Sequence, residues 1–276
     1  MANAQTKKSN KKFNSSSICL IEDYSLSKNN KNFPVWEYEG GDGFKNVKIT
    51  LNKNEEIRAD AGAMNYMSSV INIKTTTGSI LNAIGRTFSG SSAFYNIFYN
   101  EDKIPGEITL SSMMPGNIGC FYIPSGRSLN LVYDSYICST TNLDITTNVR
   151  LGGFITGYGI TFVNISANNG SGLIWGASFG DVIEKIIEPG HSIKVDNGIL
   201  LGFEASVKIN TKFIGGFTST FFSGEGLVSE IKNNDKVPIR IFLQGRSKIG
   251  FINYINRKLP KYNKHSETLS VLGDFI

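Results

Sequence analysis

The chain carries few side chains of the kinds that perform acid–base, nucleophilic or metal chemistry. Its 276 residues include two histidines, His191 and His265, and three cysteines. A Ser-His-Asp arrangement or a histidine-based metal site would need one of these imidazoles with partners at a matching spacing. His191 directly follows the turn residue Gly190, and His265 lies near the C-terminus. We therefore expect no catalytic or metal-binding residue and no cofactor.

The three cysteines, Cys19, Cys120 and Cys138, are better suited to packing than to chemistry. They are odd in number and widely spaced, and Cys120 and Cys138 lie in apolar, strand-like stretches. A buried free thiol is the ordinary state of such a residue in a reducing compartment. The sequence thus predicts structural cysteines in an intracellular, cytoplasmic protein.

Glu225 is the acid that most invites a functional interpretation, and we treat it as a speculative polar site. It stands between Gly224 and Gly226, where hydrogen bonding to turn amides is the favoured alternative. We do not expect Gly224-x-Gly226 or Gly157-x-Gly159 to be a phosphate-binding loop, because the sequence has no Walker pattern and no helical pattern follows either glycine pair. An enzyme built on Glu225 would need a concave site with perturbed carboxylates.

These residues must be positioned by a chain that repeats itself three times. Residues 46–77, 118–149 and 182–213 align without gaps when 72 and then 136 are added to the first numbering. Apolar residues recur in shared columns, and so do residues that tolerate a left-handed backbone at turns. One apolar column holds Leu51, Ile123 and Ile187, and another holds Ile57, Leu129 and Ile193. One turn column holds Asn54, Gly126 and Gly190, and a second holds Gly62, Asp134 and Gly198. A third turn column, which follows each unit, holds Gly90, Gly157 and Gly224. Each unit is expected to form strand, tight turn, strand, turn, strand.

The expected fold is all-β. Alternation with period two dominates, as in Val47, Ile49 and Leu51. The repeat of about 65 to 70 residues is longer than common solenoid repeats, so we expect three β modules packed as a sandwich or prism that close on one another, not an open array. Residues 79–88 have helical spacing and are expected to form one short helix.

Three segments are expected along the chain. The first is rich in Asn, Ser and Lys and has no acid before Glu22, which is typical of a flexible basic arm. A mitochondrial presequence is the alternative, although such segments are usually Arg-rich and the first arginine here is Arg58. The expected boundaries are an arm over 1–33, a triplicated β domain over 34–250 with repeats about 46–115, 118–181 and 182–247, and a tail over 251–276 with a short helix or tail around 249–259.

Charge and hydropathy narrow the classes of function. The formal net charge is +5, but the basic residues gather near both ends, so nucleic-acid binding by the folded part is only weakly supported. No apolar run approaches the roughly 18 to 20 residues of a membrane helix. The Asn- and Lys-rich composition is typical of an AT-rich genome, and if the source were viral a structural component of a virion would be an alternative.

Five motifs in order resemble the altered-inheritance-of-mitochondria protein 24 family. They cover residues 60–67 (DAGAMNYM), 85–94 (GRTFSGSSAF), 188–198 (EPGHSIKVDNG), 223–228 (SGEGLV) and 242–247 (FLQGRS). The resemblance implies a triplicated β-sandwich similar to the tryptophan RNA-binding attenuation protein, often trimeric and without established catalysis. It also implies cytoplasmic bacterial members and fungal members tied to the organisation of the inner mitochondrial membrane. Ser91 and Gly245 depart from the family's frequent Glu and Thr.

We therefore expect a non-enzymatic scaffold or assembly protein that acts as a homo-oligomer, with a trimer favoured. Its further partner would be an unidentified protein or a membrane-associated assembly. A small-ligand or nucleic-acid binding protein that uses a groove between repeats is the alternative. Fold similarity to an RNA-binding protein does not carry RNA binding with it.

Overall fold

The computed structural model describes residues 17–21, 33–77, 94–151, 160–213 and 227–259. Several expectations lie outside these residues and stay predictions. They are the short helix over 79–88, the turn glycines Gly90, Gly157 and Gly224, and the acid Glu225.

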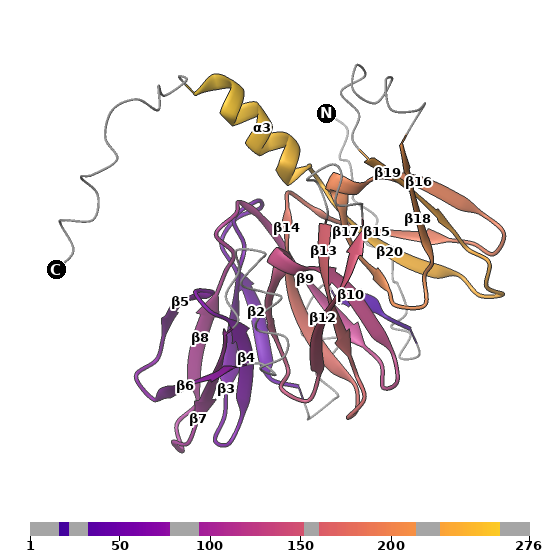
Figure 1. The fold of residues 1–276 in the computed structure, drawn as a ribbon. Helices are drawn as coiled ribbons and strands as arrows, with labels where there is room; N and C mark the ends of the chain where they lie inside the picture. Colours follow the sequence, from indigo (N-terminus) through magenta and orange to yellow (C-terminus); the bar gives the residue numbers. More distant parts are fainter. Residues whose placement is uncertain (1–16, 22–32, 78–93, 152–159, 214–226, 260–276) are drawn as a thin grey trace, which may run out of the picture.

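The described chain is almost entirely antiparallel β-structure in four sheets, which confirms the all-β sandwich prediction (Figure 1). We number the sheets I to IV in the order in which they stack. Sheet I contains, in spatial order, β2 (Val35–Glu39), β3 (Asn46–Leu51), β8 (Gly106–Leu110) and β5 (Met64–Met67). Sheet II contains β1 (Cys19–Ile21), β9 (Gly116–Ile123), β14 (Gly172–Phe179), β11 (Tyr136–Ser139), β4 (Glu56–Asp60), β7 (Phe94–Asn100) and β6 (Ile71–Thr77).

The other two sheets are built from later parts of the chain. Sheet III contains β12 (Asp144–Leu151), β13 (Ile160–Ser166), β10 (Ser128–Val132), β17 (Leu200–Glu204), β20 (Ile239–Gln244) and β15 (Val182–Ile187). Sheet IV contains β16 (Ser192–Asp196), β19 (Leu227–Lys232) and β18 (Ile209–Phe213).

The strands fall into three modules with the same internal pairing. Module 1 spans β3 to β8, module 2 spans β9 to β14, and module 3 spans β15 to β20. In each module the sixth strand pairs with the first and the third, while the fifth pairs with the second and the fourth. Each module is therefore a small sandwich that contributes one half to each of two neighbouring sheets.

Two joints connect the modules edge to edge. At joint 1, β11 of module 2 pairs with β4 of module 1 inside sheet II. At joint 2, β17 of module 3 pairs with β10 of module 2 inside sheet III. In both cases the third strand of one module extends the second strand of the preceding module.

The modules form an open row, so the expectation that they close on one another is wrong. Figure 1 shows module 1, drawn from indigo to magenta, and module 3, drawn from orange to yellow, on opposite sides of module 2. Among the described residues, β5 at the edge of sheet I and β16 at the edge of sheet IV each pair on one side only. The physical reason is that each joint merges two half-sandwiches into one sheet, and the sheets then stack face to face and extend the row.

Burial follows the position of a sheet in the row. Sheets II and III are covered on both faces, so β14 is buried at nearly every position, including Trp175. Sheet I is covered on one face, and β3 alternates between buried and half-buried residues. One core lies between each pair of sheets, and the core between sheets I and II joins Trp36 of sheet I to Trp175 of module 2, with ring centroids 5.7 Å apart.

Residues 17–21 are part of the fold, so the prediction of a flexible arm over 1–33 is wrong for them. They form β1, which pairs with β9 of module 2 with Ile21 opposite Cys120. Ile18 is fully buried, and the Ser17 hydroxyl accepts a hydrogen bond from Arg240 at 2.9 Å. The small apolar patch in an otherwise polar segment supplies the driving force for docking.

The turn columns divide into two kinds of backbone. Asn54, Gly126 and Gly190 have φ values of 66°, 77° and 78°, in the left-handed region that the column was expected to need. In the next column Gly62 also has a positive φ, of 89°. The expectation is wrong for its other two members, Asp134 and Gly198.

Asp134 and Gly198 lie in the short 3₁₀ turns η2 (Tyr133–Ser135) and η3 (Asn197–Ile199). Glycine suits position 198 because the Ser247 side chain lies close to its Cα, so that an added Cβ would overlap this side chain. The φ of Gly198 is not in the left-handed region.

The C-terminal helix α3 (Lys248–Lys258) lies where the tail over 251–276 was expected to begin, and it matches the short helix considered around 249–259. The Ser247 hydroxyl caps it by accepting a hydrogen bond from the Gly250 amide at 3.1 Å. Its first turn is fixed to the sheets by Phe251, whose ring lies 5.1 Å from that of Phe179. Beyond this turn the helix runs away from the sheets (Figure 1). Within the described residues, no helix has the length and apolar character needed to cross a membrane.

Candidate functional site

Joint 1 is fixed by Arg58, which lies on β4 and reaches across to module 2. Its guanidinium donates to the carbonyl oxygens of Leu143 at 2.7 Å and Thr141 at 2.9 Å. The Tyr136 hydroxyl of module 2 donates in return to the Arg58 carbonyl oxygen at 3.3 Å. Hydrogen bonds from a charged donor are stronger than neutral ones, so Arg58 ties the two modules together beyond the strand pairing itself.

Joint 2 places a carboxylate where joint 1 has none. Glu204 on β17 lies opposite Leu129 and is largely buried. Burial raises the pKa of its carboxyl group, while the nearby Arg127 and Arg240 and the amide of Ile18 oppose that rise. The Arg127 guanidinium lies 3.9 Å from the Glu204 carboxylate. Joint 2 therefore connects module 2, module 3 and the N-terminal strand around one polar cluster.

The two joints have the same register once the repeat offsets are applied. At joint 1, Ala59 pairs with Cys138 and Arg58 with Ser139. The residues at these repeat positions in joint 2 also pair with each other, Leu131 with Gly202 and Asn130 with Phe203. The joint is thus a reproducible strand interface that the chain forms twice.

The two open edges carry the remaining halves of this interface. β5, the third strand of module 1, presents Tyr66, which is 54% exposed, and the half-buried Met67. β16, the second strand of module 3, presents Lys194, which occupies the repeat position of Arg58 and is exposed. An unpaired strand edge offers a row of main-chain donors and acceptors to another chain.

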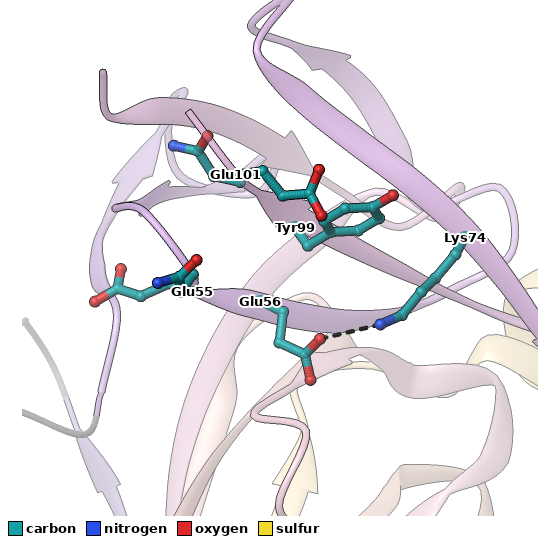
Figure 2. Close-up of a pocket in the computed structure, with 7 residues that line it drawn as sticks. Glu55, Glu56, Lys74, Tyr99 and Glu101 are labelled. Carbon is teal, nitrogen blue, oxygen red and sulfur yellow. Dashed lines mark hydrogen bonds and ion pairs between the residues drawn. The ribbon is translucent and has the colours of Figure 1, made fainter. Parts of the chain in front are cut away.

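A polar cavity of about 360 Å³ lies at one end of module 1, between the β3–β4 turn and the end of β7. Figure 2 shows Glu56 and Lys74 pointing toward each other, with the Glu56 carboxylate 3.3 Å from the Lys74 ammonium. Lys74 also lies 5.2 Å from the centre of the Tyr99 ring. Glu55 accepts hydrogen bonds from the amide and side chain of Asn52. The charged groups of Glu56 and Lys74 in the lining are thus engaged with one another.

Among the residues weighed for chemistry, those that the structure describes are not brought together, whereas His265 and Glu225 lie outside the described residues. His191 is exposed on its turn, with Nδ1 3.2 Å from the Pro189 carbonyl oxygen. Cys120 and Cys138 are fully buried free thiols, and burial raises the pKa of both. Over the described ranges, no three His, Cys, Asp or Glu side chains gather as they would around a metal ion.

Sequence reasoning missed a loop that modules 1 and 3 share. Residues 100–105 (NEDKIP) and 233–238 (NNDKVP) have the same pattern, and their asparagine side chains make equivalent bonds. Asn100 donates to Leu51 and Ile104 carbonyls, and Asn233 donates to Ile187 and Val237 carbonyls. The signal was present as an N-x-D-K-[IV]-P repeat at an offset of 133. In both modules this loop leaves its apolar residue, Ile104 or Val237, exposed at the same end of the module.

Comparisons with known proteins agree with the triplicated fold. A family model described as mitochondrial biogenesis AIM24 matches residues 36–240. An X-ray crystal structure of a Streptococcus pyogenes protein superimposes with a TM-score of 0.64 at 20% sequence identity, over 81% of this chain and 99% of that one. At that identity the likeness shows the fold alone. No curated protein sequence matches the chain.

Proposed function

The chain belongs to the AIM24 family, described by its role in mitochondrial biogenesis, and from this premise we propose that it is a non-enzymatic assembly protein that acts as a homo-oligomer. The observation that carries the proposal is the open row. In the part of the chain that the structure describes, three modules joined by two equivalent interfaces leave the two halves of a third interface unpaired at opposite ends.

An unused sheet edge normally needs protection, because it pairs readily with other chains. β5 is a short strand with exposed Met64 and Tyr66, and β16 has exposed Lys194 but is also half-buried at Ile193. Of the two edges, β16 carries a lysine, the side chain that most often blunts such an edge. Among the described residues no further strand covers either edge, and a function that uses both edges explains why they are left available.

The proposed oligomer is tested by its mass in solution. Size-exclusion chromatography with light scattering should give a multiple of the 30.3 kDa chain mass, with a trimer favoured. A mass of one chain at tens of micromolar would contradict the proposal. A saturable catalytic activity lost in Glu225→Gln would contradict its non-enzymatic part.

A further inference from the structure

We infer that copies of this chain join head to tail, with β5 of one copy pairing antiparallel with β16 of the next in the register of the two internal joints. The inference rests on the proposed homo-oligomer and specifies its interface. The occupant of each open edge is a second copy because the missing partner of β5 is a second strand of the repeat, and the missing partner of β16 is a third strand. The chain carries both at its own ends.

The repeat fixes which residues should meet. At joint 1 the pairs are Ala59 with Cys138 and Arg58 with Ser139. Adding 136 to the first member and subtracting 72 from the second gives the pairs Val195 with Tyr66 and Lys194 with Met67. Joint 2 leads to the same two pairs through Leu131 with Gly202 and Asn130 with Phe203. Two independent joints therefore predict one register.

The side chains at the open edges suit this pairing. Lys194 stands at the position of Arg58, whose guanidinium binds main-chain carbonyls of the neighbouring module. In the next copy the equivalent carbonyls belong to Ser69 and Ile71, which a lysine ammonium can reach as a donor. Tyr66 is 54% exposed although its hydroxyl is held 2.6 Å from Glu39, so its ring offers apolar surface without needing to move.

Pairing between unlike edges makes the interface heterologous. β5 and β16 lie at opposite ends of the row (Figure 1), so one chain cannot satisfy both edges by itself. A heterologous interface generates a ring when the rotation between copies closes. A trimer would then be a ring of nine modules in which every joint is of one kind.

A disulfide test reads the register directly. Met67→Cys/Lys194→Cys places two thiols at directly paired positions, where cross-strand Cβ atoms lie about 4.5 to 5.5 Å apart and a disulfide needs only modest adjustment. Under mild oxidation the double variant should form covalent multimers on a non-reducing gel. The single variants, the unmodified chain with its three native cysteines, and the out-of-register pair Met67→Cys/Ser192→Cys serve as controls.

A charge test reads the same contact without oxidation. Met67→Lys puts two ammonium groups opposite each other and should raise the dissociation constant of the assembly by about fivefold, since like charges across strands are unfavourable. Met67→Lys/Lys194→Glu should restore most of that loss. The restoration cannot arise within one chain, because the two residues lie at opposite ends of it. Tyr254→Lys on α3, where Tyr254 is 59% exposed, is the matched surface control and should leave the assembly unchanged.

The outcomes separate this inference from the proposed function. In-register cross-linking together with charge rescue supports the head-to-tail interface. The interface would be overturned, and the homo-oligomer would stand, if the wild type is oligomeric but Met67→Cys/Lys194→Cys does not cross-link. Equal cross-linking of the out-of-register pair, or no rescue by Lys194→Glu, would have the same meaning. A monomeric wild type would overturn both.

Discussion

The inside of the row and its two ends are built from the same strands but in different surroundings. β4 and β10 are second strands whose outer edges are filled by the next module, whereas the equivalent β16 pairs on one side only among the described strands. Arg58 at joint 1 is held by two carbonyl oxygens, and its counterpart Lys194 at the open end is exposed. One repeated pattern thus gives residues that are engaged inside the row and equivalent residues that are exposed at its ends. The exposed residues at the ends are the ones that can recognise a partner.

The largest expected effect distinguishes inner from outer sheets. Trp175→Ala removes a fully buried ring of sheet II that contacts Trp36 of sheet I. It should lower the free energy of unfolding by about 3 to 5 kcal/mol, measured by urea denaturation, in one transition shared by modules 1 and 2. Ile231→Ala in end sheet IV is the comparison. A smaller loss for Trp175→Ala than for Ile231→Ala, or a second separate transition, would break the distinction.

The next effect tests whether joint 1 depends on its arginine. Arg58→Met keeps the length of the side chain but removes the donors to Leu143 and Thr141, so it should cost about 2 to 3 kcal/mol. Arg257→Met on the exposed helix α3 should stay within about 0.5 kcal/mol. Thermal unfolding followed by circular dichroism compares the two. Equal shifts in Tm would mean that the strand pairing alone holds the joint.

A smaller effect is expected at the turns, whose stability should not differ between the middle module and an end module. Gly126 lies in the middle module and Gly190 in an end module, yet both have a left-handed φ and open space where a Cβ would lie. Gly126→Val and Gly190→Val should therefore each cost about 1 to 2 kcal/mol from backbone strain alone. Asn54→Gly should be nearly neutral. Chemical denaturation measures the free energy of unfolding of the three variants. A clearly larger loss for one Gly→Val variant would mean that its turn also makes contacts that the other turn does not make.

The smallest effect concerns the charge at joint 2. Because burial raises the pKa of Glu204 in the folded state, the folded protein binds a proton at this site more readily than the unfolded chain does. The contribution of Glu204 to stability therefore decreases as the pH rises from the ordinary carboxyl pKa through the raised folded value. Glu204→Gln should flatten this part of the stability curve. Unfolding titrations that keep the same slope in the variant would assign the dependence to other groups.

The sequence predicted the local pattern because each turn and strand depends on neighbouring residues. The column of Asn54, Gly126 and Gly190 identifies a turn from side-chain sterics alone, and all three adopt it. The closing of the modules was predicted wrongly because a repeat specifies the shape of each unit and not the rotation between units. Gly198 was misassigned for a similar reason, since the need for glycine arises from Ser247, far along the chain.

Candidate sites were harder to predict than elements. Glu225 was selected for its glycine neighbours and lies outside the described residues, so its role stays a prediction. Lys194 gave no signal of its own, and its importance depends on a register that only strand pairing reveals. The loop shared by residues 100–105 and 233–238 could have been found by comparing the first and third repeats without the second.

The docking of β1 sets an order of events during synthesis. Ile18 and Ile21 are made well before module 3, and Ser17 meets its partner Arg240, 223 positions further along the chain, only after the residues between them have been translated. At about 5 to 20 residues per second this takes roughly 10 to 45 s. The pairing of β1 with β9 (Gly116–Ile123) does not depend on Arg240 and can form before Arg240 has been made. The contact of residues 17–21 with module 2 can therefore form earlier than their contact with module 3.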